Sequence, residues 1–157
     1  MSLKLVNGDL LQLANNGHFD VIVHGCNCFC TMGAGIALQI KRRFPKAYEA
    51  DCATEKGSKN KLGNYSYSIE ENLKGGKFVI VNAYTQFTTA SSLDNEIPLD
   101  YTALENVLEQ IKEDFKGYKM GFPLIGCGLA GGDEKRVVAM ITQALKDEDV
   151  TIVKFDQ

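Results

Sequence analysis

The sequence lacks the features typical of nucleic-acid-binding, membrane-spanning, secreted and repeat proteins. Its formal net charge is only -3 over 157 residues, so we expect no general affinity for nucleic acid or for anionic membrane surfaces. No apolar run approaches the length of a membrane span, and the first residues show no signal-peptide pattern. Internal repeats, linkers and low-complexity tracts are absent as well. We therefore expect one domain over residues 1–157, monomeric and cytoplasmic.

The cysteines are neither numerous nor evenly paired. Five are present, which fits a reducing compartment better than a disulfide-stapled scaffold. Cys26, Cys28 and Cys30 alternate after His24, so a metal site has to be considered. Zinc sites usually combine C-x2–4-C pairs with a distant second pair, and this spacing differs. We favour buried thiols, and expect neither a bound metal nor another cofactor.

Short apolar segments alternate with helical patterns along the chain. Strands are predicted at residues 4–6, 21–23, 65–67, 78–81, 120–122 and 150–153. Helical spacing of apolar residues covers residues 36–44, 101–115 and 137–145, and Pro45 is expected to end the first of these helices. The basic run at residues 41–43 is interpreted as a solvated helix face. This alternation predicts an α/β fold with helices on both faces of a sheet.

Two glycine-rich loops, each between a predicted strand and a predicted helix, are the most informative feature. The first covers residues 25–35 and precedes a helix near Ile36, and the second covers residues 126–133 and precedes a helix near Glu134. Glycine lets backbone N–H groups approach a ligand closely, and the N-terminus of a helix attracts anions. Two such loops could hold a diphosphate from both sides.

The second loop matches the pattern G-x-G-x-x-G at Gly126, Gly128 and Gly131. A Rossmann site requires further strand–helix units and an acidic residue after the next strand, but only one strand is predicted to follow. A Walker loop is excluded because Gly131 is followed by Gly-Asp instead of Lys-Ser. Tight strand–helix packing is the plain alternative. We favour phosphate contact, because five glycines from Gly121 to Gly132 exceed what one turn requires.

Several polar residues carry both a functional and a structural interpretation. His24 ends a buried strand at the mouth of the first loop, and catalytic and structural roles are about equally expected there. Asn27 could bind a sugar hydroxyl or adopt a left-handed turn conformation. Asp9 and Asp133 are each placed to cap a following helix. Cys127 could be a stabilised thiolate near a helix start, but a cysteine phosphatase would need an arginine at the position of Asp133.

Four segments, taken together, resemble the macro domain family, the ADP-ribose-binding module. They are residues 6–10 (Val-Asn-Gly-Asp-Leu), 21–27 (Val-Ile-Val-His-Gly-Cys-Asn), 32–37 (Met-Gly-Ala-Gly-Ile-Ala) and 123–132 (Pro-Leu-Ile-Gly-Cys-Gly-Leu-Ala-Gly-Gly). They follow the family's order and cover nearly the whole chain. The variants His-x-Cys-Asn and Gly-Cys-Gly-Leu-Ala-Gly-Gly are similar to the branch of ADP-ribose 1''-phosphate phosphatases and related deacylases.

The resemblance implies a three-layer α/β/α sandwich with a mixed, mostly parallel sheet. The ligand cleft would lie at the carboxyl ends of the central strands, as in other open α/β sheets. Asp9 would accept a hydrogen bond from the adenine amino group, Phe155 could stack on adenine, and Asn27 would contact the distal ribose. The two glycine loops would enclose the diphosphate. The ligand-binding residues implied are Asp9, Leu10, Asn27, Gly33, Ala34, Gly35, Ile36, Gly126, Cys127, Gly128, Leu129, Ala130, Gly131 and Phe155.

One departure from the family changes the expected mechanism. Relatives that remove ADP-ribose from glutamate use a lysine in the segment matching residues 82–89 and an aspartate directly after Gly-Leu. This chain has no lysine in that segment, and Ala130 stands at the position of the aspartate. His24, Asn27 and Asp133 would suit water-mediated attack, with backbone N–H groups stabilising the developing charge. We expect hydrolysis of an ADP-ribose derivative, most simply ADP-ribose 1''-phosphate. A non-catalytic reader of ADP-ribose or of ADP-ribosylated macromolecules, an O-acyl-ADP-ribose deacylase and an ADP-ribosyl hydrolase stay open.

Overall fold

Six strands form one sheet in the computed structural model, which describes residues 3–88, 98–127 and 131–155. The strands are Leu3–Gly8 (β1), Val21–Cys26 (β2), Tyr65–Glu71 (β3), Lys77–Tyr84 (β4), Lys119–Phe122 (β5) and Asp149–Phe155 (β6). Their order across the sheet is β1-β6-β5-β2-β4-β3. Every neighbouring pair is parallel except β3 and β4. The predicted mixed, mostly parallel sheet is confirmed.

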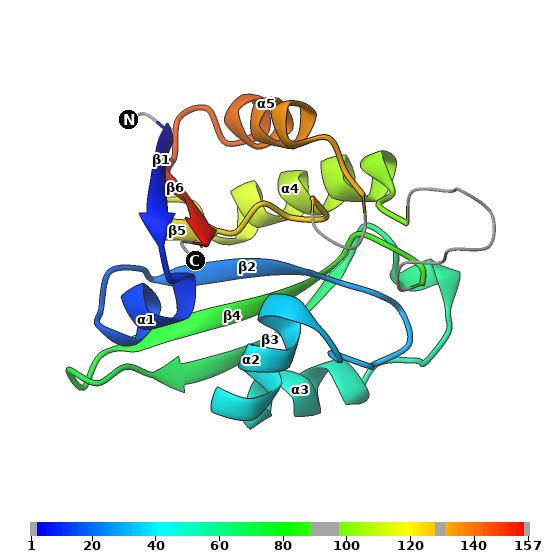
Figure 1. The fold of residues 1–157 in the computed structure, drawn as a ribbon, viewed down its shortest axis with the longest axis horizontal. Helices are drawn as coiled ribbons and strands as arrows, with labels where there is room; N and C mark the ends of the chain where they lie inside the picture. The colour runs from blue at the N-terminus through cyan, green and yellow to red at the C-terminus, as the bar shows by residue number, and fades with distance from the viewer. Residues whose placement is uncertain (1–2, 89–97, 128–130, 156–157) are drawn as a thin grey trace.

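Helices cover both faces of this sheet, so the molecule has three layers (Figure 1). They are Leu10–Asn15 (α1), Gly35–Arg43 (α2), Pro45–Cys52 (α3), Tyr101–Asp114 (α4) and Glu134–Ala144 (α5), with a short 3-10 turn at Lys59–Lys61 (η1). Helices α4 and α5 pack on one face, and α1, α2 and α3 on the other. The predicted α/β/α sandwich is confirmed. No helix in the described part of the chain has the length and apolar character needed to cross a membrane.

The central strand β2 shows why the sequence folds into three layers. Val21 and Val23 pack with α4 and α5, whereas Ile22 packs with α1, α2 and α3. Alternate residues of a strand point to opposite faces, so a continuous apolar run requires cover on both sides. The apolar stripe of each helix supplies that cover.

Two of the differences from the expected elements bear on the candidate site. Strand β2 continues through Gly25 to Cys26, so His24 does not end it. Pro45 follows the end of α2 and is also the first residue of α3, a helix that the apolar pattern did not predict. Proline suits the first helical position because the N–H group that it lacks would have no partner there.

Candidate functional site

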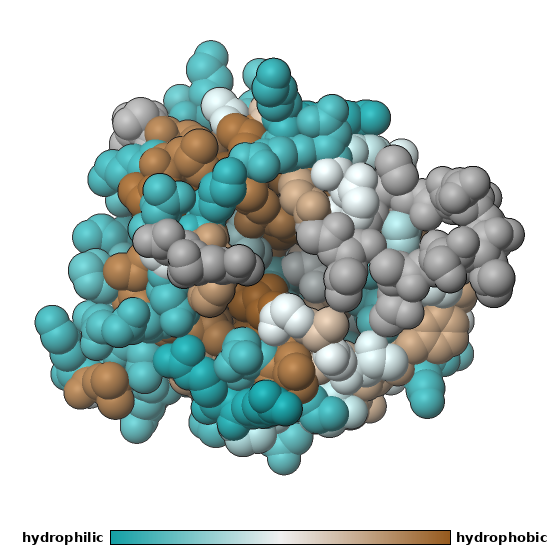
Figure 2. All heavy atoms as spheres, viewed as in Figure 1, coloured by the Kyte–Doolittle hydropathy of each residue, from teal (hydrophilic) through white to brown (hydrophobic). Residues whose placement is uncertain are grey.

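A cavity of about 1080 Å³ opens where the carboxyl ends of β1, β2, β5 and β6 meet. The first turn of α2 forms another wall. Figure 2 shows this face hollowed near its middle, with hydrophobic residues gathered beside the hollow. The cavity therefore occupies the edge of the sheet at which open α/β folds bind ligands.

Most of the residues expected to bind ligand line this one cavity. These are Asp9, Leu10, Asn27, Gly33, Ala34, Gly35, Ile36, Gly126, Cys127 and Phe155. Gly128, Leu129 and Ala130 lie outside the described residues. Gly131, His24 and Asp133 are described, but they do not line the cavity. The structure thus brings the two glycine loops together around the cavity, and the predicted acid–base residues His24 and Asp133 lie outside its lining.

The first loop presents the uncapped N-terminus of α2 to the cavity. Ala34 occupies the cap position in an extended conformation, and its side chain makes no capping hydrogen bond. Gly35, which begins the helix, has φ +57°, a left-handed conformation that glycine adopts without strain. The first-turn N–H groups of a helix have no partner within the helix. These donors are therefore available to an anion in the cavity.

The second loop depends on glycine for its close approach to neighbouring residues. Gly126 has φ +70°, and a Cβ added there would lie 2.8 Å from Leu99 Cδ1. Its carbonyl accepts a 2.6 Å hydrogen bond from the N–H of Gly132, which closes the loop. Gly121 has a different reason, because a Cβ there would meet Leu10 and Phe19 at 2.9 Å. A Cβ at Gly132 would also meet Leu99, at 2.5 Å, so close packing explains Gly121, Gly126 and Gly132, three of the five glycines.

Asp9 and Phe155 form one end of the cavity, where β1 and β6 finish side by side. Oδ1 of Asp9 accepts hydrogen bonds from Leu11 N at 3.0 Å and Gln12 N at 3.1 Å, so the expected helix cap is present. Among the described residues no partner reaches Oδ2 of Asp9. Phe155 pairs with Gly8 in the sheet and is 67% exposed. A carboxylate oxygen and an aromatic face are thus both open to a ligand.

Asn27 is held firmly in the wall of the first loop. Its Nδ2 donates to Thr31 Oγ1 at 2.6 Å, and its Oδ1 accepts from Phe29 N at 2.7 Å. The non-glycine residues with positive φ in this loop are Cys30 and Met32. The left-handed interpretation of Asn27 is therefore wrong, and its amide orders the loop instead.

Comparison with known proteins fits this geometry. The Macro domain family matches residues 23–141. The chain belongs to this family. It is 33% identical over 162 residues to an uncharacterized 17.5 kDa protein in the tk-vs intergenic region of Enterobacteria phage T4, covering 99% of this chain and 98% of that one.

Solved structures share the fold of this macro domain. The macrodomain of Mycobacterium tuberculosis DarG is 24% identical with a TM-score of 0.71, and the match covers 99% of this chain and 97% of that one. Thermosipho africanus DarTG, solved in complex with ADP-ribose, is 21% identical with a TM-score of 0.76. That match covers 98% of this macro domain and 42% of the larger chain.

His24 of this macro domain lies in a buried hydrogen-bond network between the sheet and α3. It is 1% exposed, and its Nε2 lies 2.7 Å from Asn82 Oδ1. The Nδ2 group of Asn82 donates to Ala47 O and to Ser66 Oγ, so Oδ1 faces the imidazole as an acceptor. The proton of the neutral ring is therefore on Nε2. Burial lowers the pKa of His24 from its ordinary value of 6.5 to about 4.

This pKa predicts acid sensitivity. Below pH 6.5 the unfolded chain protonates its imidazole while the folded chain does not, so stability falls until pH 4 is reached. The shift corresponds to a loss of about 3 kcal/mol in the free energy of unfolding. Urea titrations across this pH range should show a shallower decline for His24→Gln than for the parent. The control His18→Gln removes an exposed imidazole and should follow the parent, and parallel curves for all three proteins would contradict the burial argument.

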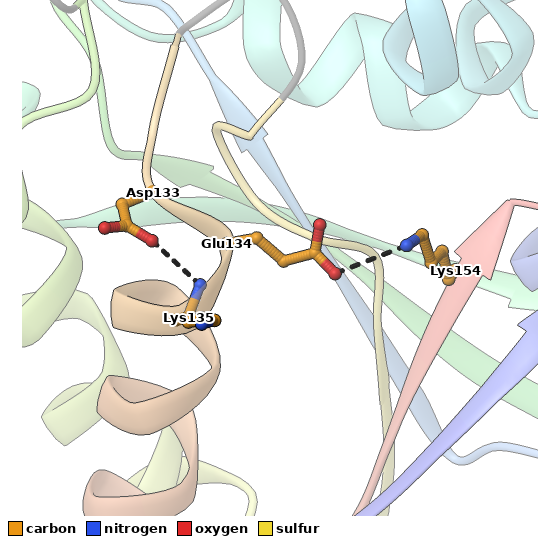
Figure 3. A network of polar contacts seen from close by, with 4 residues as sticks. All are labelled: Asp133, Glu134, Lys135 and Lys154. Carbon is orange, nitrogen blue, oxygen red and sulfur yellow. Dashed lines mark hydrogen bonds and ion pairs between the residues drawn. The ribbon is translucent and has the colours of Figure 1, made fainter.

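Asp133 caps α5, whereas its neighbour Glu134 reaches the cavity. Oδ1 of Asp133 accepts hydrogen bonds from Lys135 N at 3.0 Å and Arg136 N at 3.4 Å. Glu134 extends toward β6 and lies 3.4 Å from Lys154 Nζ (Figure 3). Glu134 and Lys154 both line the cavity. The structure therefore places the capping role at Asp133 and an ion pair at the rim.

Four of the cysteines have thiols whose pKa is raised above the ordinary value. Cys26 and Cys28 are buried, and burial raises the pKa of both. Burial also raises the pKa of Cys127, with Glu134 and Asp133 adding to the effect. The interpretation of Cys127 as a stabilised thiolate is therefore wrong, because its surroundings favour the protonated thiol. In the described part of the chain no group of histidine, cysteine and acidic residues is arranged to hold a metal ion.

Sequence reasoning missed several residues that line the cavity. Arg43 and Gln39 come from α2, and Asp51 comes from α3. Arg43 belongs to the basic run interpreted as a solvated helix face; it is exposed, and it also borders the cavity. Asp51 could not be found from apolar periodicity, because its helix was not predicted.

Proposed function

We propose that this macro domain binds ADP-ribose in the cavity between its two glycine loops. The observation that carries the proposal is the order of groups around that cavity. Asp9 and Phe155 offer an acceptor and an aromatic face for adenine, and α2 offers uncapped N–H donors for a diphosphate. Asn27, in the first loop, lines the cavity where the distal ribose would lie.

The charge distribution supports a phosphate site built from the backbone. The chain carries a formal net charge of -3, so attraction of a dianionic ligand must be local. Uncapped N–H groups at α2 supply such a local field. The basic side chains lining the cavity are Arg43 and Lys154, and Lys154 already pairs with Glu134. Thermosipho africanus DarTG, which shares the fold, was solved with ADP-ribose, and this supports the same class of ligand.

Calorimetric titration with ADP-ribose, AMP and NAD tests the proposal. ADP-ribose should bind tightest, because AMP lacks the second phosphate and the distal ribose, and NAD carries a nicotinamide for which no group is assigned. Equal or tighter binding of NAD would favour a dinucleotide site and contradict the proposal.

We further propose that the bound ligand is a substrate, with ADP-ribose 1''-phosphate as the first one to try. The N–H groups at α2 can stabilise charge that develops on a phosphate in the transition state. Direct acid–base roles for His24 and Asp133 remain predictions, and their positions outside the cavity lend them no support. Long incubation with ADP-ribose 1''-phosphate, O-acetyl-ADP-ribose and ADP-ribosylated protein separates the alternatives. Saturable binding without turnover of any of them would identify a reader.

A further inference from the structure

Among the residues that the structure describes, three carboxyl groups line the cavity, and they differ in burial. Asp9 caps α1 and Glu134 pairs with Lys154 at the exposed rim. The third, Asp51 at the end of α3, is 1% exposed. Burying a carboxylate costs free energy of folding unless it is hydrogen-bonded or paired with a cation. Carboxyl groups buried in this way beside a cavity are frequent at functional sites.

Asp51 lies at the end of the cavity away from Asp9. Its Oδ1 accepts a 2.6 Å hydrogen bond from the hydroxyl of Tyr84, the last residue of β4. Its backbone carbonyl faces Cys30 Sγ of the first loop at 3.2 Å. Strand β4 is separated from β1 by three strands of the sheet. Asp51 therefore lies beneath the first loop, on the side that holds Asn27 and the proposed distal ribose.

A buried polar network holds this carboxyl in place. The Tyr84 hydroxyl lies 2.8 Å from Ser66 Oγ and 3.4 Å from Thr54 Oγ1. Lys61 is 8% exposed, and its Nζ lies 4.5 Å from the centroid of the Tyr84 ring. Lys61 Nζ also donates to Cys28 O at 3.2 Å. The side chain of Asp51 is thus fixed by hydrogen bonding, with one cation nearby.

The surroundings also set the protonation of Asp51. Burial raises its pKa, while the Tyr84 hydrogen bond and Lys61 act in the opposite direction. The other titratable groups near it are Cys26 on β2 and Cys28 and Cys30 in the first loop, together with Cys52 and Tyr48 on its own helix. A bound phosphate would favour the protonated carboxyl further. A carboxyl whose pKa is raised keeps its proton to higher pH than an exposed one, and can then act as a general acid.

We propose that Asp51 is the acid–base residue of the cavity and protonates O1'' of the distal ribose as the bond from O1'' to phosphorus breaks. The inference rests on the proposed function. In hydrolysis of ADP-ribose 1''-phosphate, a water oxygen bonds to phosphorus as the bond from phosphorus to O1'' breaks. Asp51 gives its proton to O1'', and the proton released by the attacking water restores the carboxyl through solvent. The products are ADP-ribose and inorganic phosphate, so atoms and electrons balance.

The substitution Asp51→Asn tests this role, because the amide retains an oxygen for the Tyr84 hydroxyl but carries no transferable proton. We expect kcat on ADP-ribose 1''-phosphate to fall by about 10²–10⁴-fold, while affinity for ADP-ribose stays within about threefold of the parent. Asp114→Asn is the matched control, since Asp114 also accepts a 2.6 Å bond from a tyrosine, Tyr65, but lies outside the cavity. This control should keep the parent's kcat.

The pH profile of kcat distinguishes an acid from a merely structural residue. Lys61→Met removes the cation that lowers the pKa of Asp51, so the alkaline limb of the profile should move to higher pH. Asp51→Glu keeps a carboxyl and should retain the alkaline limb of the kcat profile, whereas Asp51→Asn should lose it. The Glu variant therefore tests the role even if the Asn variant folds poorly.

An Asn variant with parental kcat, a Glu variant without the alkaline limb, or a parent that turns over no substrate would each overturn the assignment to Asp51. Binding of ADP-ribose would stand in all three cases. A parent that does not bind ADP-ribose would instead overturn the proposed function.

Discussion

Asp9→Ala should weaken ADP-ribose binding by roughly 10- to 150-fold, the effect of losing a hydrogen bond to a charged group. The carboxylate uses Oδ1 to cap α1, and Oδ2 remains for the adenine amino group. Calorimetry with ADP-ribose measures the loss. Inorganic pyrophosphate lacks adenine, so any binding of it should be the same in the parent and the variant.

The cap complicates this substitution, and a second variant resolves it. Alanine also removes the helix cap, at a cost of about 0.5–2 kcal/mol in stability. Asp9→Asn keeps a capping oxygen but turns an amide donor toward adenine. It should unfold at the same urea concentration as the parent and still bind ADP-ribose as weakly as the alanine variant. Parental affinity in both variants would show that adenine does not sit at Asp9.

The second large effect is expected at Gly35. Gly35 has φ +57°, and a Cβ added there would meet no atom within 4 Å. A side chain at this position would therefore lie beside the uncapped first turn of α2. Gly35→Ala should cost roughly 1–2 kcal/mol in stability, because alanine disfavours this conformation. It should also lower ADP-ribose affinity by about tenfold or more, since reorienting the N–H groups weakens a hydrogen bond to a charged ligand.

Two matched glycines separate these effects. Gly117 has φ +85° in equally open space but lies far from the cavity, so Gly117→Ala should lower stability without changing affinity. Gly33 lines the cavity without a positive φ, and a Cβ there would meet only Thr31 O at 3.9 Å. Gly33→Ala should therefore be mild in both assays. Equal loss of affinity at Gly33 and Gly35 would point to simple blockage of the cavity and contradict a role for the helix N-terminus.

The glycine loops were predictable because their requirements are local. A strand, a glycine run and a helix start leave a clear pattern, and parallel strands bring their carboxyl ends to one edge of the sheet. The N-caps at Asp9 and Asp133 were also predictable, since a short acceptor side chain before an apolar helix acts within three residues. The placement of both loops against one cavity follows from these local features and from the order of the strands.

The environments of the candidate acid–base residues were harder to predict, because they depend on where strands end and on contacts distant in sequence. His24 was expected to be the last residue of its strand, but β2 continues for two more residues, to Cys26. Gly25 and Cys26 line the cavity, whereas His24 does not. Its partner Asn82 is 58 residues away. Asp51 meets Tyr84 across 33 residues. No local pattern records pairings of this kind.

A crystal structure of the protein grown with ADP-ribose tests the central claim most directly. We expect adenine between Asp9 and Phe155, the diphosphate against the N–H groups at the start of α2 and beside Gly126, and the distal ribose near Asn27. Asp51 should then be the buried carboxyl nearest to C1''. A ligand bound elsewhere, or one whose diphosphate points away from α2, would contradict the account.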